Sequence, residues 1–163
     1  MNMNGPHIHL LVNHLPVVGS LGIALLLLFA LLPAGRSYRR FALVALVVVA
    51  LAGLPAFFSG EPAEDGVDNF AGIEETRIEQ HEDAARTAVI VLELAGAVGL
   101  FGLMLFRRKA VPGSLLALAL AVDVGAVALM ARTATLGGEI RHPEIRSGAA
   151  ALPALAPEAG DHD

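Results

Sequence analysis

The chain contains no cysteine and no tryptophan, and only 17% of its residues are charged. Without cysteine it forms no disulfide, holds no iron–sulfur cluster and attaches no c-type haem. Any bound metal must therefore be held by nitrogen, oxygen or methionine sulfur. The 163 residues are 55% hydrophobic, which is too apolar for a soluble domain and typical of one small membrane bundle.

Four apolar stretches cover about residues 8–32, 41–58, 87–106 and 111–130. Each is near the roughly 20 residues that a helix needs to cross the hydrocarbon core of a bilayer. The predicted fold is all-α, an integral membrane four-helix bundle. Residues 1–146 form this transmembrane domain, and residues 147–163, which are rich in small residues and contain proline, form a flexible periplasmic tail.

Several helix boundaries can be predicted. Asn4, Gly5 and Pro6 indicate a helix start, and Pro16 predicts a kink because it cannot donate to the carbonyl four residues earlier. The third helix should begin near residue 73, well before the membrane. Residues 136–138, with two glycines, should break the fourth helix and fold the chain back.

Small residues four apart indicate which helices pack most closely. They occur in the third and fourth spans, as Ala95, Gly99, Ala117, Ala121 and Gly125. Small side chains let helix backbones approach each other inside a membrane. The third and fourth spans are therefore expected to form the tightest pair.

The basic residues indicate the orientation of the bundle. They form two short clusters between apolar stretches, over residues 36–40 and 107–109. Short basic loops face the cytoplasm, so both termini should face the periplasm, as in a multi-pass protein of the bacterial inner membrane. Since neither cluster exceeds three charges, nucleic acid is not an expected partner.

Every histidine lies at the end of the bundle opposite the basic clusters, and three separate segments contribute His7, His9, His14, His81 and His142. Helix bundles build cofactor sites from facing side chains, and a neutral imidazole on each of two helices suits bis-histidine haem b. Four arginines lie at the right depth to pair with haem propionates: Arg77, Arg86, Arg132 and Arg141.

Two other interpretations of the histidines remain open. They can be amphipathic interface residues that bind carbonyls and lipid headgroups. They can also form a divalent-metal site with carboxylates, drawn from His81, His142, Glu61 or Glu64. No metal-binding motif of fixed spacing is present to select this second interpretation.

Two carboxylates lie deep inside the predicted spans. Glu93 and Asp123 should sit at similar depth on antiparallel helices. A charge at that depth costs at least roughly 2.5–3.5 kcal/mol, so both should face the bundle interior. We expect a pair that shares a proton, or carboxyl groups that donate to the backbone or to Ser20.

Four segments resemble those of uncharacterised four-span bacterial inner-membrane proteins: His7–Pro16, Ser59–Glu64, Ile78–Glu82 and Leu136–His142. The similarity covers most of the chain except its tail. The chain is also loosely similar to membrane haem b proteins. That resemblance implies His14 and His81 as the haem and metal ligands. We expect His9 or His142 as substitutes or as ligands to a second haem.

These observations predict a b-type haem protein in electron transfer at the periplasmic face, within or beside a larger respiratory or photosynthetic complex. A periplasmic electron carrier or quinol would be its redox partner, because no histidine lies at the cytoplasmic end. The alternative is a cofactor-free accessory subunit of a membrane complex. An independent enzyme is less expected, since no nucleophile–base arrangement or phosphate-binding loop is present.

Overall fold

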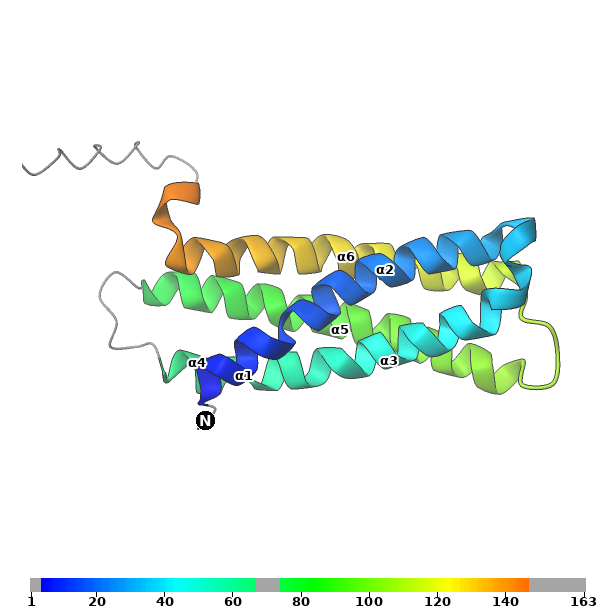
Figure 1. Cartoon of the computed structure of the whole chain (residues 1–163), viewed down its shortest axis with the longest axis horizontal. Helices are drawn as coiled ribbons and strands as arrows, with labels where there is room; N and C mark the ends of the chain where they lie inside the picture. The colour runs from blue at the N-terminus through cyan, green and yellow to red at the C-terminus, as the bar shows by residue number, and fades with distance from the viewer. Residues whose placement is uncertain (1–3, 67–73, 147–163) are drawn as a thin grey trace, which may run out of the picture.

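The computed structural model describes residues 4–66 and 74–146, and every element in these ranges is a helix (Figure 1). The predicted tail over residues 147–163 lies outside the described residues. The elements are α1 (Gly5–Val12), α2 (His14–Leu31), η1 (Pro33–Tyr38), α3 (Arg39–Phe58), α4 (Gly60–Glu64), α5 (Glu75–Leu105), α6 (Gly113–Arg141) and η2 (Pro143–Ile145). The all-α fold class is confirmed.

Four helical stretches are long and apolar enough to cross a membrane: Gly5–Leu31, Pro33–Phe58, Glu75–Leu105 and Gly113–Arg141. Each predicted span lies along one of them, give or take a residue or two at the ends. Much of their apolar surface is exposed on the outside of the bundle. A hydrocarbon environment would cover this surface, since soluble monomers rarely expose apolar patches of this extent.

The four long helices form a ring in the order α2, α3, α5, α6, in which each helix packs on two neighbours. Figure 1 shows them running lengthwise, with η1 and the α5–α6 connection at one end and α1, α4 and η2 at the other. The contact between α5 and α6 is the most extensive, as predicted. Short connections between successive helices impose this up-and-down arrangement.

The small residues expected to join α5 and α6 do something different. Ala117 and Ala121 are exposed, and the buried side of α6 is formed by Leu116, Ala119, Asp123, Ala126 and Met130. Gly96 and Gly99 of α5 face α3 instead. A Cβ at Gly96 would lie 2.5 Å from Ala50, and one at Gly99 would lie 3.3 Å from the carbonyl oxygen of Leu43.

The first helix starts and bends where the sequence predicts. The side chain of Asn4 accepts a hydrogen bond from the backbone N–H of His7, which caps α1. The chain passes from α1 to α2 at Asn13, three residues before Pro16. Beyond this joint α1 packs on α4 and α3, and in Figure 1 it lies well apart from the end of α6.

The basic end is closed by arginines that bind backbone carbonyls. Arg39 donates to the carbonyl oxygens of Ala30, near the end of α2, at 3.2 Å and of Val111 at 2.8 Å. Arg40 donates to those of Phe106 and Lys109. The guanidinium groups therefore tie the end of α2 and the α5–α6 connection to the start of α3.

The prediction of a turn at residues 136–138 is wrong, because α6 continues as a helix to Arg141. The glycines serve packing there. A Cβ at Gly137 would lie only 2.9 Å from Cε1 of His81 on α5. A residue without a side chain is needed for the imidazole to lie against the helix.

The core is divided into two apolar clusters. One lies toward the basic end and contains Ile23, Leu27, Leu43, Leu46 and Leu116, and the other lies toward the histidine end and contains Ala50, Ala88, Leu92, Ala126 and Met130. Between them lie two fully buried polar residues, Ser20 of α2 and Asp123 of α6.

Candidate functional site

His81 lies on the inward side of α5 at the outer end of the bundle. It is half-buried, and its Nδ1 lies 3.0 Å from the carbonyl oxygen of Thr133 on α6. A carbonyl oxygen only accepts hydrogen bonds, so Nδ1 must bear the hydrogen and Nε2 keeps its lone pair. The contact with Gly137 fixes the same ring from the side.

His9 of α1 is held in the same way. Ser59 donates its hydroxyl hydrogen to the carbonyl oxygen of Ala56 at 2.9 Å, and its oxygen lies 3.0 Å from Nδ1 of His9. With the hydroxyl hydrogen directed to Ala56, the serine oxygen accepts from Nδ1–H. Nε2 of His9 is then the nitrogen left to bind a ligand.

These two imidazoles lie at the same end of the bundle, close enough for a charge on one to influence the other, and both are partly buried. They come from helices that are far apart in sequence. Their hydrogen-bond partners are Ser59, which directly follows α3, and Thr133 of α6. Two imidazoles with Nδ1 held by the protein and Nε2 available are the usual preparation of histidine ligands.

Asn13 adds an unsatisfied polar atom to the same region. It follows His9 by four residues, so the two side chains lie on one face of the chain. The Oδ1 atom of Asn13 is buried and has no hydrogen-bond partner among the described residues. This face therefore presents an acceptor that a bound group or a water molecule can satisfy.

The other predicted histidines lie elsewhere. His7 and His14 are exposed. The implied pairing of His14 with His81 stays a prediction, and the partly buried, hydrogen-bonded His9 is the substitute that the structure favours. His142 ends α6, is exposed, and lies 2.9 Å from Glu144 through Nδ1. A hydrogen bond from its own backbone N–H and one from His142 lower the pKa of Glu144.

The four predicted arginines also differ. Arg77 pairs with Glu139 at 2.7 Å and with Glu74 at 3.6 Å, so it is already engaged. Arg86 and Arg132 are exposed and make no ion pair within the described ranges. Arg141 is exposed as well.

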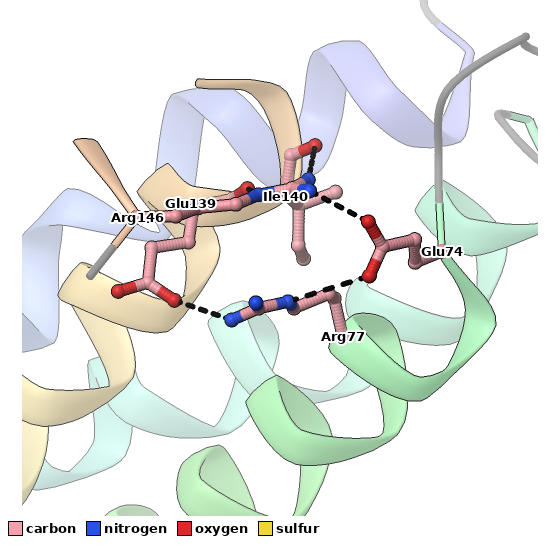
Figure 2. A network of polar contacts seen from close by, with 5 residues as sticks. All are labelled: Glu74, Arg77, Glu139, Ile140 and Arg146. Atoms are coloured by element: carbon pink, nitrogen blue, oxygen red, sulfur yellow. Dashed lines mark hydrogen bonds and ion pairs between the residues drawn. The ribbon is translucent and has the colours of Figure 1, made fainter. Parts of the chain in front are cut away.

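Figure 2 shows the network that holds Arg77. Arg146 donates to Glu74 at 2.7 Å and to the carbonyl oxygen of Glu139 at 2.9 Å, which completes a chain of contacts between the start of α5 and the end of α6. The network joins the start of α5, which precedes His81, to the end of α6.

A small hollow opens on the outer side of the α5–α6 pair. Its volume is about 240 Å³, and its lining residues are Gln80, Asp83, Ala84, Thr87, Arg132 and Leu136. Neither His9 nor His81 lines it. The hollow is too small for a porphyrin and is lined by residues of α5 and α6.

The proposed metal site of mixed histidine and carboxylate ligands finds no support. Across residues 4–66 and 74–146, no group of three or more His, Cys, Asp or Glu side chains could hold a metal ion. Glu61 and Glu64 lie on α4, and His142 is bound to Glu144.

The two intramembrane carboxylates do not form the predicted hydrogen-bonded pair. Asp123 is fully buried, and neither of its carboxylate oxygens has a hydrogen-bond partner in the described part of the chain. Glu93 is half-buried, and its Oε1 lies 3.8 Å from the position of a Cβ on Gly53. Glu93 therefore faces α3, whereas Asp123 lies between the two core clusters.

The roles of Ser59, Thr133 and Gly137 in positioning the imidazoles are not predicted by the sequence. A serine, a threonine and a glycine give no signal of such a role by themselves, and two successive glycines indicate a turn rather than a packing contact.

Comparison of the chain with protein-family models, with curated proteins and with solved structures found no match.

Proposed function

We propose that this chain is a multi-pass protein of the bacterial inner membrane that binds a b-type haem through His9 and His81 and exchanges electrons at the periplasmic face. The observation that supports the proposal is the half-buried pair of imidazoles, each with Nδ1 held by a group from another helix. Haem b bound between two histidines supplies one-electron redox chemistry. The resemblance to four-span inner-membrane proteins and membrane haem b proteins agrees with it.

The donor set fits such a group. The absence of cysteine restricts the protein to non-covalent haem. Arg86 and Arg132 are the exposed cations at the matching depth, where they can pair with propionates.

The orientation follows from the charges. Arg36, Arg40 and the basic cluster over 107–109 are exposed at the end opposite the histidines. By the positive-inside rule that end faces the cytoplasm. Electrons would then be exchanged with a periplasmic carrier or with quinol, within or beside a larger respiratory or photosynthetic complex, because the cytoplasmic end has no histidine to hold a second haem.

One observation favours a second candidate, a cofactor-free accessory subunit. The hollow of about 240 Å³ is not lined by either imidazole, so a porphyrin needs the outer ends of the helices to separate. Such a separation would occur between α1 and the end of α6. In the structure α1 packs on α3 and α4 and lies apart from that end.

An absorption spectrum of the protein, expressed with haem supply and purified in detergent, distinguishes the two candidates. A low-spin b-type spectrum is expected, and His9→Ala or His81→Ala should abolish it or convert it to a high-spin form. His7→Ala and His14→Ala are the matched controls on exposed histidines and should leave it unchanged. A protein without a Soret band under these conditions, or a spectrum insensitive to both His9→Ala and His81→Ala, would exclude this site.

A further inference from the structure

Asp123 is the most unusual residue of the bundle interior. Its side chain is 0% exposed, and both carboxylate oxygens lack a hydrogen-bond partner among the described residues. Buried polar groups in proteins almost always have a partner. A buried carboxyl group without one is costly if it is ionised, and it therefore favours a bound proton or another bound cation.

The residues at the same depth can be identified from the contacts. The position of a Cβ on Gly125 of α6 lies 3.8 Å from Val91 of α5. The two helices are antiparallel, so the residue two before Gly125 on α6 lies at the same height as the residue two after Val91 on α5. These residues are Asp123 and Glu93. A Cβ on Gly113 would lie 3.9 Å from Leu31 of α2. Since α2 and α6 are also antiparallel, Asp123, which is ten residues after Gly113, lies within one residue of the height of Ser20.

None of these neighbours can stabilise a carboxylate. Ser20 donates its only hydroxyl hydrogen to the carbonyl oxygen of Val17 at 3.1 Å. Glu93 is itself acidic, and its Oε1 is buried without a partner. The apolar lengths of α2 and α3, residues 15–35 and 41–60, contain no charged residue, so no cation faces Asp123 from either helix.

An ionised Asp123 would thus be a buried charge with neither a counter-ion nor a donor, which is the most costly state for a polar group. A metal ion would need several ligands, and no such group of side chains surrounds it in the described structure. A proton needs no additional space. Once bound, it turns an acceptor-only carboxylate into a donor that can reach the free lone pairs of a neighbouring oxygen.

We propose that Asp123 is a proton-binding site in the middle of the bundle, in a layer with Ser20 that separates the two apolar core clusters. The ligand is a proton, bound at neutral pH. The site is independent of the haem proposal, since it involves none of the residues around His9 and His81. Ionisable residues inside membrane helices commonly mark proton pathways, and Asp123 is the position from which such a pathway would start.

Infrared spectroscopy of the cofactor-free protein in lipid nanodiscs tests the proposal. At pH 7 the wild type should show the carbonyl stretch of a protonated carboxylic acid. Isotope labelling of aspartate at the side-chain carboxyl carbon should shift this band, because Asp123 is the only aspartate in the four apolar stretches of the sequence. Asp123→Asn should remove the band, and the matched control Glu93→Gln should leave it in place.

The labelled wild type keeps the test valid even if Asp123→Asn does not fold. Aspartate carboxylate bands alone at pH 7, with no labelled carbonyl stretch, would overturn the proposal and indicate a bound cation instead. A carbonyl band that is insensitive to aspartate labelling and disappears in Glu93→Gln would overturn it as well, because the proton would then reside on Glu93.

Discussion

Gly137 shows how a single residue positions the imidazole of His81. A Cβ at this position would lie 2.9 Å from Cε1 and 3.2 Å from Nδ1 of that ring. Gly22 of α2 is its opposite, because nothing lies within 4 Å of the corresponding Cβ position. The two glycines form a matched pair, one enclosed by a side chain and one open.

Alanine at Gly137 should displace the ring and weaken its hydrogen bond to Thr133, whereas alanine at Gly22 should stabilise α2 by about 0.5–1 kcal/mol. We expect Gly137→Ala to have a free energy of unfolding in mixed micelles about 1–3 kcal/mol below that of Gly22→Ala, the usual cost of overpacking. In a His81→Ala background this difference should disappear. If Gly137→Ala is as stable as Gly22→Ala with His81 present, the proposed contact is not formed.

Residue-level predictions depended on an ideal helix. His7 and His14 lie on the same face only if one continuous helix contains both. The chain instead passes from α1 to α2 at Asn13, so their relative directions are not those of an ideal helix. His9 is turned inward to Ser59 instead. The depth of Asp123 could be predicted from the sequence, but the direction of Glu93 could not, since it depends on the space beside Gly53.

At the scale of elements, α5 and α6 extend beyond their apolar stretches and are joined there by ion pairs. The side chains of Arg77 and Glu139 are 29% and 13% exposed, so their pair is better shielded than one on an open surface. Arg146 adds a second connection through Glu74 (Figure 2). These contacts hold together the helix ends that flank the hydrogen bond from His81 to Thr133.

A double-mutant cycle with Arg77→Gln and Glu139→Gln should give a coupling energy of about 0.5–1 kcal/mol in the free energy of unfolding, the upper range for partly exposed pairs. The coupling should decrease at high salt, because the pair lies at the water-facing end of the bundle. Arg86→Gln, which removes an exposed arginine elsewhere on α5, is the control and should change the free energy of unfolding little. A coupling that does not respond to salt would contradict an electrostatic origin.

The elements themselves were largely predictable. Apolar length fixed the four spans, and Asn4, Pro6 and Pro16 fixed the start and the bend of the first helix. The error at Gly137 and Gly138 has a physical cause: glycine is tolerated inside a helix where a neighbouring side chain needs its space, and the sequence does not reveal that neighbour.

At the scale of the whole molecule, the two ends of the bundle are chemically different. Arg39 and Arg40 bind backbone carbonyls of the α5–α6 connection at one end, where other basic residues are exposed. The partly buried imidazoles and the ion-pair network occupy the other end. In a bilayer this difference determines which compartment each end faces.

The native chain has no cysteine, so a single introduced cysteine is the only thiol in the protein. Ser37 of η1 and Glu61 of α4 are exposed and lie at opposite ends of the bundle (Figure 1). In intact cells with a permeable outer membrane, an impermeant thiol reagent should label Glu61→Cys, whereas Ser37→Cys should react only after the inner membrane is opened. The reverse pattern would turn the histidine pair toward the cytoplasm and replace the periplasmic carrier by a cytoplasmic one, although the two ligands would remain. Labelling of both positions from one side would contradict a bundle that spans the membrane, and with it the electrostatic argument that places the imidazoles at a single membrane surface.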